Sequence, residues 1–383
     1  MKEKIIIGLI ALQILAISCN GKVSAQSSSS TSNNGRISAV FALEAFKKTK
    51  KLNGVLVPDV EAITNAINGL SSSVIDELTQ NYSSPYGAFQ YDFTADKKGV
   101  AIRKYNNNNT TVVIVPATIE GITVTEIQKG AFDFLNLVGV VLPETIIKIG
   151  GKNKDDSTFP LTFSSSLVAV NFPANLKEIG NEAFYYCENL TSVNLPEGLE
   201  KLGDGAFKLC KKLTKVTFPT SLKEIGYEAF YFCENLTSAN LPEGLNKLGI
   251  RAFANCNRLS SITLPSSLQV IPEYAFWHTR IVNLIVPEGV GIINGGAFGE
   301  CYNLITVTLP STIKEIHHTG TWNYSGAFYN CSNLTDIIIP DSVKSISFIN
   351  HSSSVSRDSF EGCGKLKLMV RQRIMDLGYK GVF

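Results

Sequence analysis

The chain has 383 residues, and its 35 lysines and arginines are almost balanced by 33 aspartates and glutamates. A net charge of +2 argues against the strongly basic surface of nucleic-acid-binding proteins, so we expect no nucleic-acid partner. Hydrophobic residues make up 44% of the chain and charged residues 18%, which excludes wholesale disorder.

The first 18 residues have the pattern of an export signal. Lys2 and Lys4 form a short basic region, and residues 5–17 are nearly all apolar, a run too short to span a bilayer as a permanent helix. We therefore expect the protein to be exported to the cell envelope.

Cys19 ends this apolar run in a segment, residues 15–19, that resembles a bacterial lipobox. In such a motif the cysteine is lipidated and becomes the first residue of the mature chain. Residues 19–36 are rich in serine and asparagine, which is the composition of a flexible tether. The sequence therefore predicts an outer-surface lipoprotein that contacts the membrane through its lipid anchor only. The alternative is ordinary cleavage after Ala25, where Val23-Ser24-Ala25 meets the small-x-small rule equally well.

Residues 37–88 are predicted to form a helical N-terminal segment. Pro58-Asp59 is a helix-start signal, and Gly69 together with Ser71-Ser72-Ser73 predicts a break. The apolar residues behind the start are three or four positions apart: Val60, Ile63, Ile67, Leu70 and Val74. Two heptads are too few for a coiled coil, so the segment is interpreted as a helical stalk or cap.

A unit of 23 residues dominates the chain from residue 116 to residue 370. Residues 177–196 recur at 223–242 with three changes, at Tyr227, Phe232 and Ala239. Such a period is the signature of a solenoid, in which each unit buries its apolar face against its neighbours. Ten units fit the pattern. The insertions at residues 152–159, 317–326 and 350–358 fall at one template position, so they should loop out from one edge of the stack.

Each unit contains three structural signals. Residues 190–196 alternate apolar and polar side chains and end at a proline, the pattern of a short strand with one buried face. Residues 176–180 form a second short extended piece, and residues 181–187 have the spacing of a single helical turn. The predicted fold is a mainly β solenoid with two short strands and one helical turn in each of about ten repeats.

The pattern Ile-Gly-x-x-Ala-Phe-x-x-Cys-x-x-Leu-x-x-Val-x-Leu-Pro resembles the BspA-type, or treponemal-type, leucine-rich repeat. The resemblance covers about residues 89–370, with departures at Leu135, Ser166 and Thr279, which stand at the cysteine position. It implies that residues 89–115 form a β-hairpin cap on the first repeat. It also implies a bacterial cell-surface protein with a role in adhesion or recognition, because proteins of this type include adhesins that bind host matrix proteins and neighbouring bacteria.

Residues 371–383 are predicted to form a helical cap at the other end of the solenoid. The helix is expected over Arg371–Leu377, and Gly378 is its stop signal. Such a cap covers the apolar end of the last repeat.

The cysteines of the repeats are predicted to be buried small apolar residues. Cys187, Cys210, Cys233 and Cys256 are one repeat apart, so they form a ladder with a step of about 4.8 Å. A disulfide needs Cβ atoms ~3.8 Å apart on converging vectors, and a linear ladder cannot surround a metal tetrahedrally.

No catalytic motif is recognisable in the chain. The pair His317-His318 has only Glu315 at ligand spacing, and we found no phosphate-binding loop, nucleophile elbow or His-Glu-x-x-His motif. We therefore expect no enzyme activity, no cofactor and no metal.

The outward positions of the longer strand predict a mostly small and polar surface on the concave side of the solenoid. They are Ser192, Asn194, Lys215, Thr217, Ser238, Asn240, Ser261, Thr263, Asn283, Ile285, Thr306, Thr308, Asp336 and Ile338. This surface is a candidate ligand-binding face. It lacks aromatic and arginine anchors, and a plain solvent-facing sheet has the same composition.

A second candidate site is a row of aromatic residues on one flank. The two positions between the phenylalanine and the cysteine of the repeat are aromatic in alternate units, about 9–10 Å apart: Tyr185, Tyr186, Tyr231, Phe232 and Trp277, with Trp322, Tyr324 and Tyr329 as an extension. The row is interpreted as an anchor strip for a peptide or a glycan, because aromatic rings offer a large contact area at low entropic cost. The alternative is a 46-residue duplication whose rings pack on neighbouring turns.

These features predict a cell-surface protein-binding or adhesion module that recognises an extracellular protein or glycan. Two other functions stay open at this point. One is a glycan-binding module that uses the aromatic row, and the other is a structural envelope protein without an external ligand.

Overall fold

The computed structural model describes residues 30–52, 55–107, 110–133, 135–151, 163, 165–317, 326–346 and 358–383. Several predicted features lie outside these residues, namely the export signal, Cys19, His318, Trp322, Tyr324 and most of the three insertions. Among the helices of the described part, none is long and apolar enough to cross a membrane.

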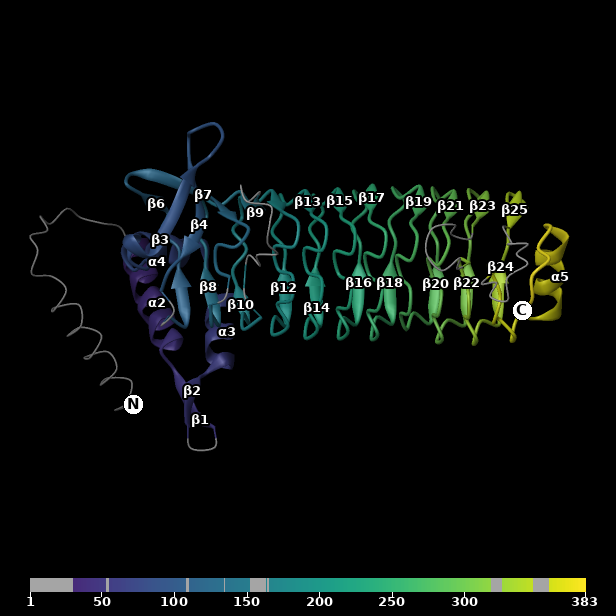
Figure 1. Cartoon of the computed structure of the whole chain (residues 1–383), viewed down its shortest axis with the longest axis horizontal. Coiled ribbons are helices and arrows are strands. Elements are labelled where there is room, and N and C mark those ends of the chain that lie inside the picture. Colours follow the sequence, from purple (N-terminus) through teal and green to yellow (C-terminus); the bar gives the residue numbers. More distant parts are fainter. Residues whose placement is uncertain are drawn as a thin grey trace, which may run out of the picture.

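The molecule is a rod of stacked coils with helices at both ends (Figure 1). Each coil contributes one strand to each of two rows, and the coils follow one another along a nearly straight line in this view. The long-strand row consists of β5 (Val112–Ile114), β8 (Gly139–Val141), β10 (Ala169–Val170), β12 (Ser192–Asn194), β14 (Lys215–Thr217), β16 (Ser238–Asn240), β18 (Ser261–Thr263), β20 (Asn283–Ile285), β22 (Thr306–Thr308) and β24 (Asp336–Ile338). The short-strand row consists of β7 (Ile122–Gln128), β9 (Lys148–Gly151), β11 (Glu178–Ile179), β13 (Lys201–Leu202), β15 (Glu224–Ile225), β17 (Lys247–Leu248), β19 (Val270–Ile271), β21 (Ile292–Ile293), β23 (Glu315–Ile316) and β25 (Ser345–Ile346).

Strands of neighbouring coils pair in parallel and in phase, so equivalent repeat positions lie side by side. In the short-strand row, hydrogen bonding joins β7, β9, β11, β13, β15 and β17 in one nine-stranded sheet, together with three strands that precede this row. It joins β19, β21, β23 and β25 in a second sheet. The long-strand row is divided into shorter sheets, β5-β8-β10, β12-β14, β16-β18 and β20-β22-β24. The predicted mainly β solenoid with a 23-residue repeat is confirmed.

The helical turn predicted for residues 181–187 is not present, and this prediction is corrected. The backbone N–H groups of Glu182, Phe184 and Tyr186 donate to carbonyls of the next coil instead of to their own segment. The N–H groups between them close tight turns within the segment, such as Tyr185 to the Glu182 carbonyl at 3.1 Å. Glu182 and Tyr186 have positive φ angles of 56° and 62°, which a right-handed helix does not accommodate. The segment therefore ties neighbouring coils together as a third ladder.

A column of stacked phenylalanines fills the core. All ten are buried, and consecutive rings stack with centroids 4.8–5.7 Å apart: Phe132, Phe163, Phe184, Phe207, Phe230, Phe253, Phe276, Phe298, Phe328 and Phe360. Because this distance is close to the spacing of paired strands, each coil contributes one ring. Tyr105 adjoins the first ring of the column, at 6.2 Å, and Tyr379 adjoins the last, at 5.9 Å.

The cysteine ladder runs beside this column. The cysteines from Cys187 to Cys363 are buried and free, as predicted for small core residues. Each thiol also donates a hydrogen bond to the phenylalanine carbonyl of the preceding coil, for example Cys210 to Phe184 at 3.1 Å. Burial raises the pKa of the six thiols from Cys187 to Cys331, that of Cys301 to about 11, so these six stay neutral at physiological pH. At the departure Thr279 the hydroxyl donates to the carbonyl of Phe276 in its own coil, at 3.0 Å.

The N-terminal segment contains helices α2 (Ser30–Phe46), α3 (Val60–Asn68) and α4 (Ser72–Asn81), followed by the short 3₁₀ helix η1 (Tyr86–Ala88). Asp59 caps the start of α3, where its carboxylate accepts the N–H of Ala62, and Gly69 caps the end of the helix. Helix α2 begins inside residues 19–36, which corrects the prediction of a flexible tether over that whole range. The serine-rich start of this helix has a low helix propensity. The helix is stabilised by tertiary packing, because Ala39, Ala42 and Phe46 are buried in a shared apolar cluster.

Two hairpins flank these helices. β1 (Thr49–Leu52) and β2 (Val55–Pro58) form an antiparallel hairpin, which the sequence analysis did not predict. β3 (Phe89–Phe93) and β4 (Val100–Tyr105) form a second hairpin within residues 89–115, and β4 pairs in parallel with β7 of the first coil. The two-residue strand β6 (Thr118–Ile119) pairs with β7 on the way into the solenoid.

The helices cover the outer side of the first long strands. Ile63 and Ile67 of α3 pack in one apolar cluster with Ile114, Val141 and Ala169 of β5, β8 and β10. The approach is close, because a Cβ atom at Gly139 would lie 2.4 Å from the Ile67 side chain. From β12 onward the same side of the row is free of the helices (Figure 1).

A C-terminal helix covers the other end of the rod. α5 (Leu368–Asp376) begins three residues before the predicted start, and Gly378 follows it with a φ of 93°. Ile374 and Tyr379 join the apolar core of the last coil. Both ends of the phenylalanine column are therefore shielded from water.

We predict that Phe230→Ala lowers the free energy of unfolding by about 3–5 kcal/mol. Its ring is buried and stacks on both Phe207 and Phe253, so truncation leaves a cavity that rigid neighbouring coils cannot close. The measurement is denaturant unfolding followed by circular dichroism. Ile285→Ala, at a side chain that is 71% exposed, is the control and should cost under about 0.5 kcal/mol. Equal losses for the two variants would contradict the role of the column.

Candidate functional site

The long-strand face is defined as the outward side of β12 to β24, the surface predicted from the strand alternation. Its outward side chains are exposed, except that Ser192 and Asp336 are half-buried. The residues between them, such as Val193 and Val216, are buried, except that Ile262 is half-buried. Threonine hydroxyls donate to asparagine side chains of the preceding coil, as in Thr217 to Asn194 at 3.2 Å. The same bond recurs between Thr263 and Asn240 and between Thr306 and Asn283.

A cleft of about 240 Å³ opens where the helices leave this face. Its walls are the α3–α4 turn, with Asn68 and Ser72, and the strand side, with Phe172, Ser192 and Asn194. Two of the predicted face residues thus line a concave site and not a flat sheet. No pattern in the sequence indicates the cleft, because its walls come from segments far apart in the chain.

The C-terminal half of the long-strand face carries exposed apolar side chains. Ile285 is 71% exposed and Ile338 is 63% exposed, and Thr308 lies between them in the sheet β20-β22-β24. Asp336 on the same strand as Ile338 pairs with Lys367 next to α5. This end of the face therefore combines exposed branched apolar residues with hydrogen-bonding groups.

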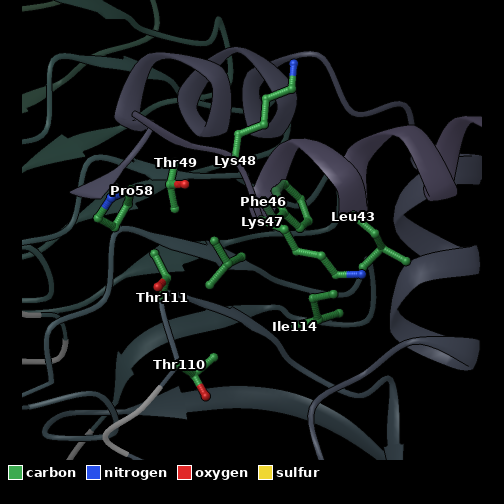
Figure 2. Close-up of a pocket in the computed structure, with 10 residues that line it drawn as sticks. Leu43, Phe46, Lys47, Lys48, Thr49, Pro58, Thr110, Thr111 and Ile114 are labelled. Atoms are coloured by element: carbon green, nitrogen blue, oxygen red, sulfur yellow. The ribbon is translucent and has the colours of Figure 1, made fainter. Parts of the chain in front are cut away.

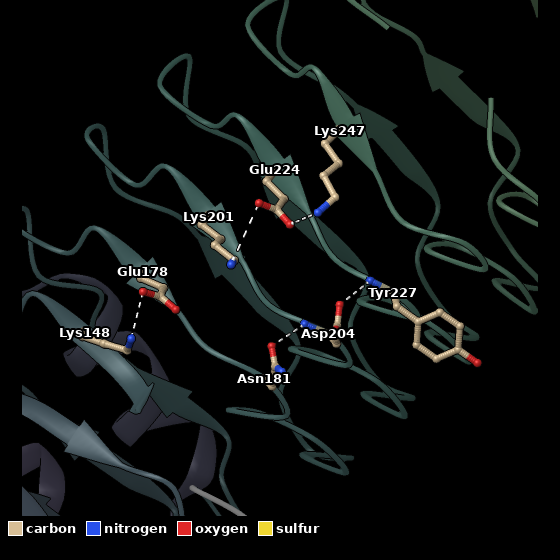
Figure 3. A network of polar contacts seen from close by, with 8 residues as sticks. All are labelled: Lys148, Glu178, Asn181, Lys201, Asp204, Glu224, Tyr227 and Lys247. Carbon is tan, nitrogen blue, oxygen red and sulfur yellow. Dashed lines mark hydrogen bonds and ion pairs between the residues drawn. The ribbon is translucent and has the colours of Figure 1, made fainter. Parts of the chain in front are cut away.

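The outward side of the short-strand row, here called the short-strand face, carries a charge ladder of alternating lysines and glutamates (Figure 3). Lys201 lies 3.9 Å from Glu224, which in turn lies 2.7 Å from Lys247 of the next coil. A second ladder, of Asn181 and Asp204 side chains, accepts backbone N–H groups one coil further on, at 2.9 and 2.8 Å. Glu178 and Glu224 on this face are therefore paired with lysines of neighbouring coils.

The aromatic flank, defined by Tyr185, Tyr186, Tyr231, Phe232 and Trp277, is built on contacts between coils. The Lys208 ammonium lies 5.9 Å from the ring of Tyr185 and 5.3 Å from that of Tyr231, so one cation separates the two rings. Tyr186 is 39% exposed and has Lys211 over its ring at 5.7 Å. Phe232 is half-buried and packs edge-on against Tyr231.

Trp277 stacks on an aromatic ring two coils away, because the coil between them has a glycine at the facing position. Its ring is parallel to that of Tyr329, with centroids 6.1 Å apart, although the two residues belong to coils two steps apart. The intervening coil presents Gly299, where a Cβ atom would lie 2.1 Å from the Trp277 ring. Glycine at this position therefore lets the two rings meet, an arrangement that the row of aromatic residues alone did not reveal.

Glu228 anchors the centre of the aromatic flank. Its carboxylate is buried and contacts Lys208 at 2.5 Å and Arg251 at 3.4 Å. Burial raises the pKa of Glu228, but hydrogen bonds from Lys208 and Tyr227 and the charge of Lys208 outweigh it, so the pKa lies below its ordinary value of 4.5. The flank is thus a buried ion pair bordered by rings.

An open pocket of about 450 Å³ lies between the N-terminal helices and the first coil (Figure 2). Leu43, Phe46 and Ile114 supply its apolar wall, and Lys47 lies across it. Lys48 points away from the pocket in this view. The lining comes from α2, the base of the β1–β2 hairpin and the segment before β5, so only the tertiary fold assembles it.

The structure describes only the first histidine of the pair. His317 contacts Glu315 at 2.7 Å, and His318 lies outside the described residues. Within the described ranges, no group of three or more histidine, cysteine, aspartate or glutamate side chains is placed to hold a metal ion.

We predict that Glu228→Gln lowers the free energy of unfolding at neutral pH by about 1–2 kcal/mol. The depressed pKa means that the carboxylate stabilises the fold above pH 4.5 and that this stabilisation is lost as the pH falls through the folded-state pKa. The gap between wild type and variant should therefore shrink from pH 7 to pH 3 in denaturant titrations. A gap that is independent of pH would contradict the ion pair's role.

The comparisons with known proteins agree with this architecture. The model of the BspA type leucine-rich repeat region matches residues 155–282 and 269–367, with six copies. A comparison with curated protein sequences gives no match.

Among solved structures, the chain is similar to the leucine-rich repeat protein of T. pallidum, with 23% identity over 79% of this chain and 98% of that chain and a TM-score of 0.37. It is also similar to a leucine-rich cell surface protein from Faecalibacterium prausnitzii, with 21% identity over 67% and 94% of the two chains and a TM-score of 0.34. A leucine-rich repeat protein from Eubacterium ventriosum has 18% identity over 74% and 94% of the two chains and a TM-score of 0.42. Because the family model covers more than half of the 383 residues and its repeat is the coil seen here, the chain belongs to the BspA-type leucine-rich repeat family.

Proposed function

We propose that this protein is a cell-surface binding module that holds a partner protein on the long-strand face. The observation that carries the proposal is that the protein's own helix α3 already docks on the same side of the preceding strands, through Ile63 and Ile67. A surface that accepts an apolar helix at β8 and β10 continues uncovered from β12 to β24. We infer that a partner segment lies there as an extension of the helical cap.

The uncovered part of the long-strand face, from β12 to β24, has a length and side chains that suit a protein partner. Seven coils from β12 to β24 extend over about 29 Å, the length of an extended segment of about nine residues. The exposed asparagine and threonine side chains offer hydrogen bonds along this length, and Ile285 and Ile338 offer apolar anchors near its end. The cleft beside Ser192 and Asn194 gives the partner a defined stop at the helical end.

The glycan alternative is the weaker one on the same contacts. A sugar ring stacks on an aromatic face, but Lys208 lies over Tyr185 and Tyr231, and Trp277 stacks on Tyr329. The rings of the aromatic flank therefore already serve coil-to-coil packing. On the long-strand face, the contacts that the structure shows between side chains are the threonine-to-asparagine hydrogen bonds and the ion pair of Asp336 with Lys367.

We predict that the double variant Thr217→Arg and Thr263→Arg weakens partner binding at least tenfold, because it places bulky charges in the middle of the face. The assay is surface plasmon resonance on arrayed extracellular matrix proteins and polysaccharides, with melting temperatures measured in parallel. Asn246→Arg, an exposed position outside this face, is the matched control and should bind as wild type.

Two outcomes of this assay would oppose the proposal. Unchanged protein binding by the double variant would exclude the long-strand face. Loss of polysaccharide binding by Tyr186→Ala, Phe232→Ala and Trp277→Ala together, with no protein ligand found for wild type, would favour the glycan module instead.

We propose further that Cys19 carries a lipid that holds the protein at the outer surface, as its lipobox-like context suggests. Intact cells fed a radiolabelled fatty acid should label the wild-type protein but not Cys19→Ala, and external protease should cleave the repeats. An unlabelled wild-type chain would support cleavage after Ala25. Repeats that resist protease until the envelope is opened would favour the structural envelope protein.

A further inference from the structure

The tip of the β1–β2 hairpin exposes apolar side chains that the fold does not use. Leu52, Val55 and Leu56 are 60%, 64% and 65% exposed, and none of them belongs to either apolar core cluster of the described chain. A two-stranded hairpin of this length has no core of its own to stabilise it. Three neighbouring exposed apolar residues therefore mark a contact with something outside the chain.

Both faces of the hairpin are apolar at the tip. Leu52 pairs directly with Val55, and Lys51 pairs with Leu56. Successive cross-strand pairs point to opposite faces, so Leu52 and Val55 lie on one face and Leu56 lies on the other. A groove on a protein covers one face of such a ribbon, whereas a fluid lipid interface surrounds the whole tip.

Basic residues extend from the base of this hairpin, at Lys47 and Lys48, onto β1, at Lys50 and Lys51. Lys47, Lys48, Lys50 and Lys51 fall within five positions, and the ion pairs they form are long, 3.7 Å from Lys47 to Glu44 and 3.9 Å from Lys50 to Asp59. Lys48 and Lys51 have no ion-pair partner in the part of the chain that the structure describes.

Several lysines of the solenoid form shorter ion pairs. Lys148, Lys211 and Lys247 lie 2.5–2.9 Å from glutamates of neighbouring coils. The long ion pairs of Lys47 and Lys50 hold the hairpin charge less tightly, so it is available to an outside partner.

We propose that the β1–β2 hairpin inserts its tip into an anionic membrane surface. Leu52, Val55 and Leu56 enter the boundary between headgroups and acyl chains, and the lysine ammonium groups contact lipid phosphates while their stems lie along the apolar layer. The strands β1 and β2 extend beyond α3 and the neighbouring coils in the view of Figure 1, which leaves the outer end of the hairpin open to a surface. This contact is separate from the proposed protein-binding face and does not depend on a lipid at Cys19.

The test uses the chain from residue 20 to residue 383, which lacks the export signal and Cys19 and retains every described residue. Co-sedimentation is measured with vesicles of phosphatidylcholine alone and of phosphatidylcholine mixed with phosphatidylglycerol. The wild-type chain should bind the anionic vesicles and lose this binding as salt is added. Lys48→Gln, Lys50→Gln and Lys51→Gln together should weaken it by about a hundredfold, at roughly fivefold for each lysine.

A second pair of variants separates insertion from charge attraction. Leu52→Ser, Val55→Ser and Leu56→Ser together should weaken vesicle binding at least tenfold and leave the melting temperature unchanged. Ile285→Ser with Ile338→Ser, exposed apolar residues on the solenoid, is the matched control and should bind vesicles as wild type. Leu52→Trp should show a blue-shifted emission with anionic vesicles only.

Three results would overturn the proposal. They are no vesicle binding by the wild-type chain, equal binding by the tip variants, and a Leu52→Trp emission that vesicles do not shift. If the tip variants instead lose binding to a matrix protein in the plasmon-resonance assay, the hairpin is a protein-docking element. Failure of Thr217→Arg with Thr263→Arg to affect that assay would refute the protein-binding face and leave the vesicle result unaffected.

Discussion

Backbone hydrogen bonds between coils are the interaction on which this structure depends. Hydrogen bonds join neighbouring coils along three ladders: the two strand rows and the turn segment that contains Phe184. A coil by itself leaves these donors and acceptors unpaired, so only the stack is stable. The ladders set the distance between coils, and that distance places the phenylalanine rings in contact. Both ends of the stack must then be closed, which Tyr105 and Tyr379 do from outside the regular repeat.

The same translation brings identical positions of successive repeats together on the surface. A charge repeated without change would repel its copies at this spacing, and the chain avoids this by alternating Lys201, Glu224 and Lys247. On the aromatic flank, Lys208 separates two tyrosines in a comparable alternation. Side chains that pair with one another in this way stabilise the rod, and fewer of their charges and rings remain free to contact a partner.

Two places depart from this internal pairing, and both proposals concern them. The long-strand face continues beyond the helices that cover its start, and it presents Ile285 and Ile338 to solvent. The β1–β2 hairpin combines Leu52 and its apolar neighbours with lysines that are weakly paired. A molecule anchored by the hairpin at one end would present the long rod, and its free strand face, to a partner protein.

The repeat, the two strands of each coil and the buried positions of Phe184 and Cys187 could be predicted from the sequence, because they depend on a local pattern that recurs in phase. The sequence did not determine the conformation of residues 181–187, since a three-to-four spacing suits a helix and a turn equally well, and the hydrogen bonds that decide between them go to another coil. Only the tertiary structure placed α3 on β8 and β10, where Gly139 admits Ile67, and brought Trp277 onto Tyr329 over Gly299. The physical reason is the same in each case: periodicity reports on contacts one repeat away, whereas these contacts join segments that the period does not relate.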